Sequence, residues 1–161
     1  KRNHGEWMPA NGSEPAHLKA VPYTLPAKTD RKQRTIYTLS MPVSSGDHPP
    51  VVLQPETKIR VRGKIASNHR IWFGMTLRRE NGDFAGRFQT ILPAEEFKSG
   101  EPFEVVLNLS DYHLDPSLAQ WAEHLPKTPY GLIVKNIWCH TLWDPAGLQV
   151  SEIALTTPNE K

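Results

Sequence analysis

The sequence predicts an all-β protein, an antiparallel two-sheet β-sandwich with one short helix. The strongest observation is the run 58–92, in which three segments of alternating apolar and polar residues are separated by the turn sequences SNH and ENGD. A period of two places one set of side chains in a core and the other on an outer face. In addition, no strand-like segment alternates with a helix of ordinary length. These observations favour two sheets packed face to face over a parallel α/β fold.

The first third of the chain has the weakest pattern. Residues 1–16 are rich in polar residues, Gly and Pro, and we expect an extended lead-in there. Residues 17–25 predict an edge strand, because Pro22 lacks the backbone N–H that a central strand needs. Residues 35–41 predict a clear strand and residues 51–53 a short one. This part of the sequence leaves the edge of one sheet undefined.

The three segments of 58–92 define which side chains should face the core. The inward sets are Ile59, Val61, Gly63 and Ile65, then Ile71, Phe73, Met75 and Leu77, then Phe84, Gly86, Phe88 and Thr90. The outward sets hold several Arg and Lys, one Trp and one Gln, with almost no carboxylates. A solvated charged face is the ordinary explanation of such a set. The alternative is a sheet face that holds a ligand.

Three further strands are predicted over residues 103–109, 131–139 and 148–155, which brings the total to eight or nine. The predicted helix covers residues 116–125, with Asp115 as its N-cap and proline at its first position. Its apolar face would hold Leu118, Trp121 and Leu125, which places Trp121 in the core.

Length, charge and cysteine content exclude several classes of protein. With 161 residues, the chain is expected to form one domain over residues 1–161. A formal net charge of +2 is too small to indicate a nucleic-acid partner. No apolar run is long enough for this segment to insert into a membrane. The single cysteine, Cys139, excludes an intrachain disulfide but not export.

Four outward residues make up the candidate ligand-binding face: Trp72, Arg78, Arg87 and Gln89. Sugar sites combine apolar, often aromatic walls with a few polar groups. Because guanidinium groups form bidentate contacts with carboxylate and sulfate, an acidic glycan is a natural extension. Trp143, in a predicted loop, is a second candidate ring platform. The alternative for a tryptophan on a sheet is that it packs beneath a loop.

The order of the segments between residues 58 and 156 carries a family resemblance. The segments KIRVRGKI, IWFGMTLRR, GDFAGRFQT, FEVVLNLSDYH, GLIVKNI and GLQVSEIAL follow one another there. This order resembles the galactose-binding-like jelly rolls, which include many carbohydrate-binding modules and the complex I intermediate-associated family. The resemblance implies a jelly-roll sandwich that binds sugars on the concave face of a sheet or in loops at one end.

The resemblance also implies a structural calcium near the last strand, where Glu152 in SEIAL would correspond to a ligand. A solvent-exposed or simply hydrogen-bonded glutamate is the alternative, since calcium needs several oxygen ligands. No other cofactor is expected. Because the chain begins at Lys1 without a methionine, we expect a domain of a larger exported protein, in an extracytoplasmic location (secreted, periplasmic or cell surface).

Catalytic patterns are weak. Glu95 and Glu96 are adjacent and would diverge on a strand, whereas glycoside hydrolysis needs two carboxylates that face one bond. No spacing supports a zinc site. We therefore expect no enzyme but a non-catalytic carbohydrate-binding module. The alternative is a structural, sensor or protein-interaction domain of a surface or signalling protein that meets an acidic protein partner. A lyase or hydrolase remains a third option that requires converging carboxylates.

Overall fold

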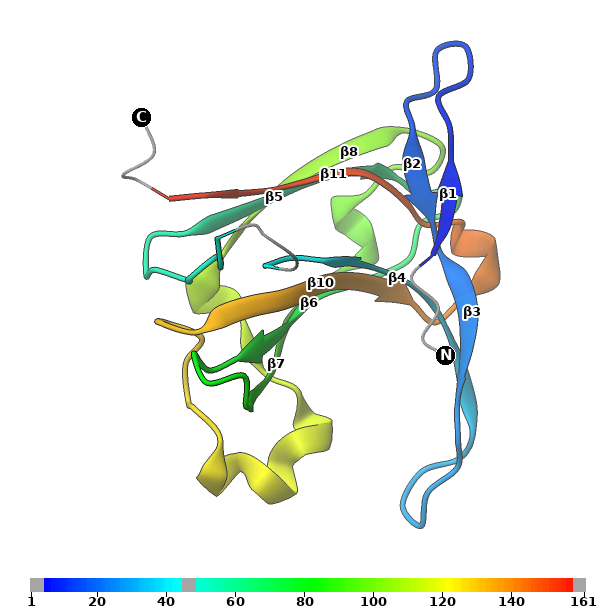
Figure 1. Ribbon diagram of the computed structural model, residues 1–161. Coiled ribbons are helices and arrows are strands. Elements are labelled where there is room, and N and C mark those ends of the chain that lie inside the picture. Colours follow the sequence, from blue (N-terminus) through cyan, green and yellow to red (C-terminus); the bar gives the residue numbers. More distant parts are fainter. Residues whose placement is uncertain (1–4, 45–48, 158–161) are drawn as a thin grey trace.

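The computed structural model describes residues 5–44 and 49–157 and confirms the all-β, two-sheet antiparallel sandwich (Figure 1). The five-stranded sheet has the order β1 (Glu6–Met8), β2 (His17–Lys19), β11 (Gln149–Thr156), β5 (Lys58–Lys64) and β8 (Pro102–Asn108). The six-stranded sheet has the order β3 (Val21–Leu25), β4 (Arg34–Pro42), β10 (Ile133–Thr141), β6 (Ile71–Arg78), β7 (Phe84–Leu92) and β9 (His113–Leu114).

Short 3₁₀ helices occupy the connections: η1 (Ala94–Glu96), η2 (Leu109–Asp111), η3 (Pro116–His124) and η4 (Asp144–Ala146). Among the described residues, no helix is long and apolar enough to cross a bilayer. The architecture is compatible with a jelly roll.

The core lies between the two sheets and follows the predicted alternation. Ile59 and Val61 of β5 face Phe73 and Met75 of β6 across one continuous apolar cluster, and each of these four side chains is at most 1% exposed. Burial of a side chain of this size contributes about 1.5–3 kcal/mol. The core therefore fixes which face of each strand points outward, and with it the position of every candidate site residue.

The N-terminal third differs from the expectation in two ways. The stretch 17–25 is not one edge strand but two, because the chain passes from β2 in one sheet to β3 in the other at Ala20, whose N–H donates to Leu148 O at 3.0 Å. Of these two strands only β3, which contains Pro22, lies at an edge of its sheet, whereas β2 lies between β1 and β11. The lead-in 1–16 includes β1, which pairs with β2.

The inward set predicted for β7 is wrong at its first position. Phe84 is 48% exposed, whereas Ala85 is fully buried. The physical reason is a register shift in the β6–β7 ladder between Leu77 and Arg78. An extra residue in one strand reverses the facing of everything beyond it. Gly86 sits at this irregularity with a φ of 108°, a conformation that favours glycine.

The helix forms where predicted, as η3, and Asp115 is its N-cap through a 2.9 Å hydrogen bond from the Ser117 N–H. However, Trp121 is 48% exposed, so the expectation of a core tryptophan is wrong. The helix projects away from the six-stranded sheet (Figure 1), and within it only Leu118 is buried. The shared apolar face of the helix therefore has no layer to pack against beyond its first turn.

Candidate functional site

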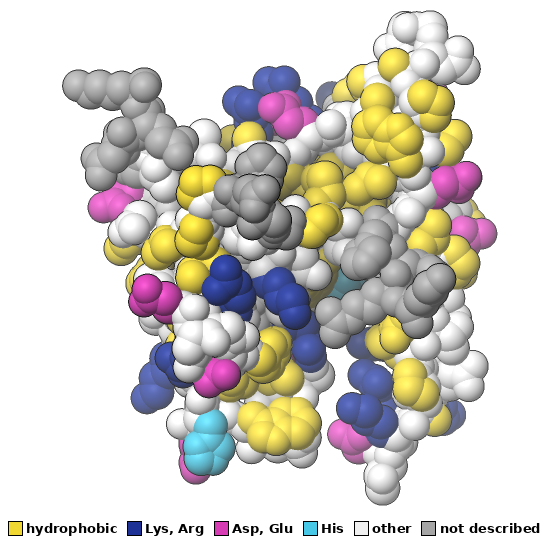
Figure 2. Space-filling view, viewed as in Figure 1, with side chains coloured by type: hydrophobic (Ala, Val, Ile, Leu, Met, Phe, Trp, Pro, Cys, Tyr) yellow, Lys and Arg dark blue, Asp and Glu magenta, His cyan; other side chains and the backbone are white. Residues whose placement is uncertain are grey.

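The candidate site is the outer face of the six-stranded sheet. Figure 1 shows η3 projecting below this sheet on one side and the β3–β4 hairpin on the other. Figure 2 shows a hollow between the two projections, with Lys and Arg side chains on both sides of it. We call this hollow the cleft. The outward residues of β10, β6 and β7 form its floor.

The four predicted face residues do lie on one side of one sheet. Trp72 and Arg78 belong to β6, Arg87 and Gln89 belong to β7, and these strands are direct antiparallel neighbours. They do not form one compact patch, however. Trp72 and Arg78 lie at opposite ends of β6, roughly 20 Å apart at about 3.3 Å per residue. Arg78 also donates to the Arg79 carbonyl at 3.3 Å.

Three nearly parallel aromatic rings lie side by side in the middle of the floor. His140 of β10 lies directly opposite Trp72 of β6, and their rings stack with centroids 5.2 Å apart and planes 17° apart. Trp138, two residues before His140 on the same face, stacks on the other side of the imidazole at 5.2 Å and 10°. All three side chains are half-buried. We call Trp72, His140 and Trp138 the aromatic floor.

Gly74 determines the orientation of the Trp138 ring. It pairs with Trp138, and a Cβ added to it would lie 2.1, 2.2 and 2.4 Å from three atoms of the six-membered ring of that indole. Three nearly equal distances mean that the Cβ would meet the face of the ring and not its edge. The Trp138 ring therefore lies flat across β6, in space that any residue larger than glycine would fill.

Trp138 and His140 are the site residues that sequence reasoning missed. In β10 the residues alternate, so that Cys139 is fully buried while Trp138 and His140 lie on the outer face. The signal that was available is the alternation of Asn136, Trp138 and His140 in that strand. Read as an outward set, it matches the composition of a ligand-binding surface.

Burial between the indoles lowers the pKa of His140 from its usual value of 6.5 to about 4. The positive charge of Arg34 contributes to this lowering of the pKa, and the negative charge of Asp115 opposes it. Arg34 and Asp115 thus both lie close enough to influence the centre of the floor. His140 is neutral at neutral pH, so the middle of the aromatic floor carries no charge of its own.

Arg87 connects the floor to the η3 wall. Its Nε donates to Asp115 Oδ2 and its Nη2 donates to Ser117 Oγ, both at 3.1 Å. Burial alone would raise the pKa of Asp115, but the hydrogen bonds from Ser117 and Arg87 outweigh it and hold that pKa below its usual value. Much of the guanidinium group is therefore committed to positioning η3. Gln89 lies two residues after Arg87 on the same face of β7. It pairs with Gly74 of β6 and with His113 of β9.

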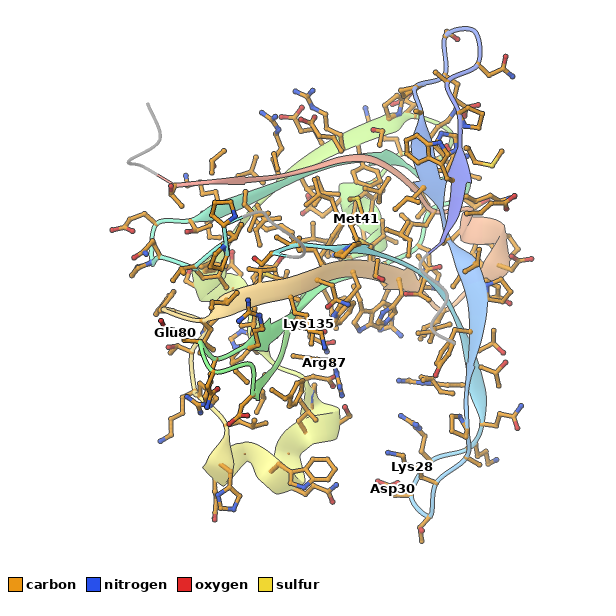
Figure 3. All side chains as sticks on the ribbon, viewed as in Figure 1. Lys28, Asp30, Met41, Glu80, Arg87 and Lys135 are labelled. Carbon is orange, nitrogen blue, oxygen red and sulfur yellow. The ribbon has the colours of Figure 1, made fainter. Side chains whose placement is uncertain are left out.

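The basic residues of β5 do not belong to this face. Arg60, Arg62 and Lys64 lie on the outer face of the other sheet, where Arg60 and Arg62 form ion pairs with Glu152 at 3.1 Å each and Arg62 also pairs with Glu104 at 2.8 Å. The carboxylates that seemed absent from the outward sets come from the neighbouring strands β8 and β11. The cleft is lined by a different group of cations, which includes Arg87 and Lys135 (Figure 3).

The residues around Glu152 do not fit a calcium site. Both of its carboxylate oxygens accept from guanidinium groups, Oε1 from Arg60 and Oε2 from Arg62. Calcium would have to displace two ion pairs and find further oxygen ligands. Within residues 5–44 and 49–157, no group of three or more His, Cys, Asp or Glu side chains is arranged to hold a metal ion.

Trp143 lies outside the cleft, in the β10–β11 loop just before η4, and its side chain is 44% exposed. Its indole stacks on the imidazole of His69, with centroids 6.1 Å apart and planes 26° apart. His69 belongs to the β5–β6 loop, so the two loops meet at this end of the sandwich. The exposure of Trp143 agrees with the loop placement that the sequence predicted.

A separate cavity of about 770 Å³ opens at the other edge of the sandwich, between β8 and the β7–β9 pair. Its lining includes Val105 and Val106 of β8 and, of the predicted ligand residues, only Gln89. Val106 is 54% exposed on the edge strand of its sheet. This cavity therefore presents an open strand edge, whereas the cleft presents an aromatic sheet face.

Comparison with known proteins adds no family assignment, since no protein-family model and no curated protein matches this chain.

Proposed function

We propose that this protein is a non-catalytic carbohydrate-binding module of the galactose-binding-like type, part of a larger exported protein, and that it binds an acidic glycan in the cleft. The observation that carries the proposal is the aromatic floor. Three parallel rings occupy the outer face of a sheet where they add nothing to the core between the sheets. The parts of aromatic rings that remain accessible to solvent are surfaces on which the C–H faces of pyranose rings pack.

The polar groups around the floor have the chemistry that such a ligand needs. Gln89 supplies an amide beside Gly74, on which Trp138 lies. Arg34 adds a positive charge that lowers the pKa of His140. Lys135 and Arg87 point toward the hollow from the sheet, while Lys28 lies at the tip of the hairpin across from them (Figure 3). A neutral floor with cations at its borders favours a sugar that bears carboxylate or sulfate groups.

A glycan array probed with the protein tests the proposal, with the variants Trp72→Ala and Trp138→Ala beside the wild type. We expect the wild type to bind uronic-acid or sulfated glycans and each variant to lose most of that binding. Trp7→Ala is the matched control, because Trp7 is an exposed indole of the other sheet, 64% exposed in β1. An array in which the floor variants bind as the wild type does would contradict the proposal.

The second candidate function is protein interaction through the edge of β8. The specific observation in its favour is the cavity beside an unprotected edge strand with an exposed valine, since such edges accept an added strand from a partner. A proline at Val106 would disturb added-strand pairing and leave the cleft intact. If the array is flat and Val106→Pro abolishes binding to a protein partner, this second function replaces the first.

A further inference from the structure

The aromatic floor does not end at Trp72. The imidazole of His69 lies 6.5 Å from the Trp72 ring at an interplanar angle of 34°, and Trp143 stacks on the far side of His69 at 6.1 Å. Five rings therefore follow one another from Trp138 in the cleft to Trp143 at the end of the sandwich. The angles between planes increase from 10° and 17° within the floor to 34° and 26° beyond it. The series of rings thus turns as it leaves the cleft.

The loops that carry the outer rings are held in place by hydrogen bonds. The Ala66 N–H donates to Ala146 O at 2.7 Å, which joins the β5–β6 loop to the β10–β11 loop. The Asn68 N–H donates to Ser99 Oγ at 3.0 Å, and the Ser99 hydroxyl donates to Asn68 Oδ1 at 2.7 Å. His69 and Trp143 therefore sit on backbone that is ordered before any ligand arrives, which reduces the entropy cost of binding.

Arg70 lies between the aromatic floor and the two outer rings, His69 and Trp143. Its guanidinium carbon lies 4.8 Å from the centroid of the Trp72 ring, a cation–π contact, and the side chain is exposed. Among the described residues, no carboxylate forms an ion pair with Arg70. This contrasts with Arg87 and Arg62, which are both paired. A guanidinium group that is held on an indole and has no anionic partner is suited to bind a carboxylate or sulfate.

We propose that the cleft and the loop end of the sandwich form one continuous binding surface for an extended acidic polysaccharide rather than for a single terminal sugar. The aromatic floor binds the units inside the cleft, Trp143 packs against units that have left it, and Arg70 binds an anionic group between them. This inference rests on the proposed function and specifies its ligand: a chain long enough to reach from Trp138 to Trp143.

The test is the dependence of affinity on chain length, measured by calorimetric titration. The probes are uronic-acid oligomers and sulfated galactan oligomers, each from disaccharide to octasaccharide. For the wild type we expect affinity to rise along the series that binds. For Trp143→Ala we expect unchanged affinity for the shortest oligomer that binds and about a tenfold loss for the longest, the effect of one lost stacking contact. Arg70→Gln should show the same pattern.

Trp7→Ala is the matched control, since Trp7 is an exposed indole of the five-stranded sheet, away from both the cleft and the series of rings. Its dependence on chain length should equal that of the wild type. If Trp143→Ala keeps the full gain with length, or loses affinity equally for short and long oligomers, the continuous surface is refuted while cleft binding stands. If the wild type binds none of these oligomers, this inference fails together with the acidic-glycan function.

Discussion

The outer faces of the two sheets are built on the same alternation but carry opposite kinds of side chain. On the five-stranded sheet, Arg60, Arg62, Glu104 and Glu152 neutralise one another in exposed ion pairs. On the six-stranded sheet, the corresponding positions hold indoles, an imidazole and cations at the borders. On the first face, these charged side chains are paired with one another. The second leaves aromatic area uncovered, which a stable fold does not need, and this difference supports the binding role proposed for the six-stranded sheet.

The largest expected effect is the loss of stability on replacing Gly63 of the five-stranded sheet, which is to be compared with Gly74 of the six-stranded sheet. A Cβ on Gly63 of β5 would lie 2.2 Å from the Gln149 backbone oxygen and 2.8 Å from the Phe103 ring. Neither can move without disturbing the core, so Gly63→Ala should lower the free energy of unfolding by about 3 kcal/mol. Urea denaturation measures this. Glycan affinity of the remaining folded protein should stay at the wild-type value, and a loss of affinity would mean that the two faces are coupled.

The second effect depends on pH and comes from His140 alone. Its pKa is about 4 in the folded protein and 6.5 when unfolded, so between these values the unfolded chain binds more protons. The contribution of neutral His140 is complete above pH 6.5 and is lost as the pH falls toward 4, by up to about 3 kcal/mol.

Comparison of the wild type with His140→Gln in urea denaturation at several pH values isolates this contribution. The variant should lack the part of the acid destabilisation that lies between the two pKa values, while other titrating groups affect both proteins equally. Parallel stability curves for the two proteins across that range would contradict a buried, neutral imidazole in the aromatic floor.

The third effect concerns Gly74 of the six-stranded sheet and is to be compared with that of Gly63→Ala. In Gly74→Ala the new methyl group meets the face of the Trp138 ring, a partly exposed side chain outside the core that must shift to make room. We expect a stability loss of only about 1 kcal/mol. Binding of acidic glycans should nevertheless fall at least about tenfold, because the aromatic floor is no longer flat. Full affinity in this variant would show that the orientation of Trp138 is irrelevant to binding.

The smallest effect concerns the ion pairs of the five-stranded sheet. Arg62 and Glu152 are 48% and 38% exposed, and pairs of this kind contribute about 0–1 kcal/mol. Glu152→Gln should therefore change the unfolding free energy by less than about 1 kcal/mol, and salt should reduce the difference further. A larger loss, or a change in stability on addition of calcium that the variant lacks, would give Glu152 a role that these contacts do not.

Alternation within single strands predicted the fold and the common face of Trp72, Arg87 and Gln89, because facing is a local property of a strand. Which strands become neighbours in a sheet, by contrast, depends on residues far apart in the sequence. β5 pairs with β11, whose residues lie some ninety positions later in the chain, so nothing near Arg60 revealed that Glu152 would neutralise it. The same holds for the ring contacts between β6 and β10.

Irregularities in the strands account for the remaining differences. A register shift beside Ala85 turned Phe84 outward, and a second shift between Val134 and Asn136 brings Lys135 to the outer face next to Asn136. A bulge has little sequence signal of its own, because it is set by the strand on the other side of the ladder. Trp121 was misplaced for a related reason: helical periodicity predicts a shared face but not whether a layer covers it.

The indole N–H signals in a two-dimensional NMR spectrum test the central claim most directly, since the five tryptophans are distributed over the aromatic floor, the η3 wall, the loop end and the other sheet. On titration with an acidic octasaccharide that the protein binds, the signals of Trp72, Trp138 and Trp143 should shift, and that of Trp7 on the other sheet should stay in place. A shift of the Trp7 signal, with the signals of Trp72 and Trp138 unchanged, would contradict the account.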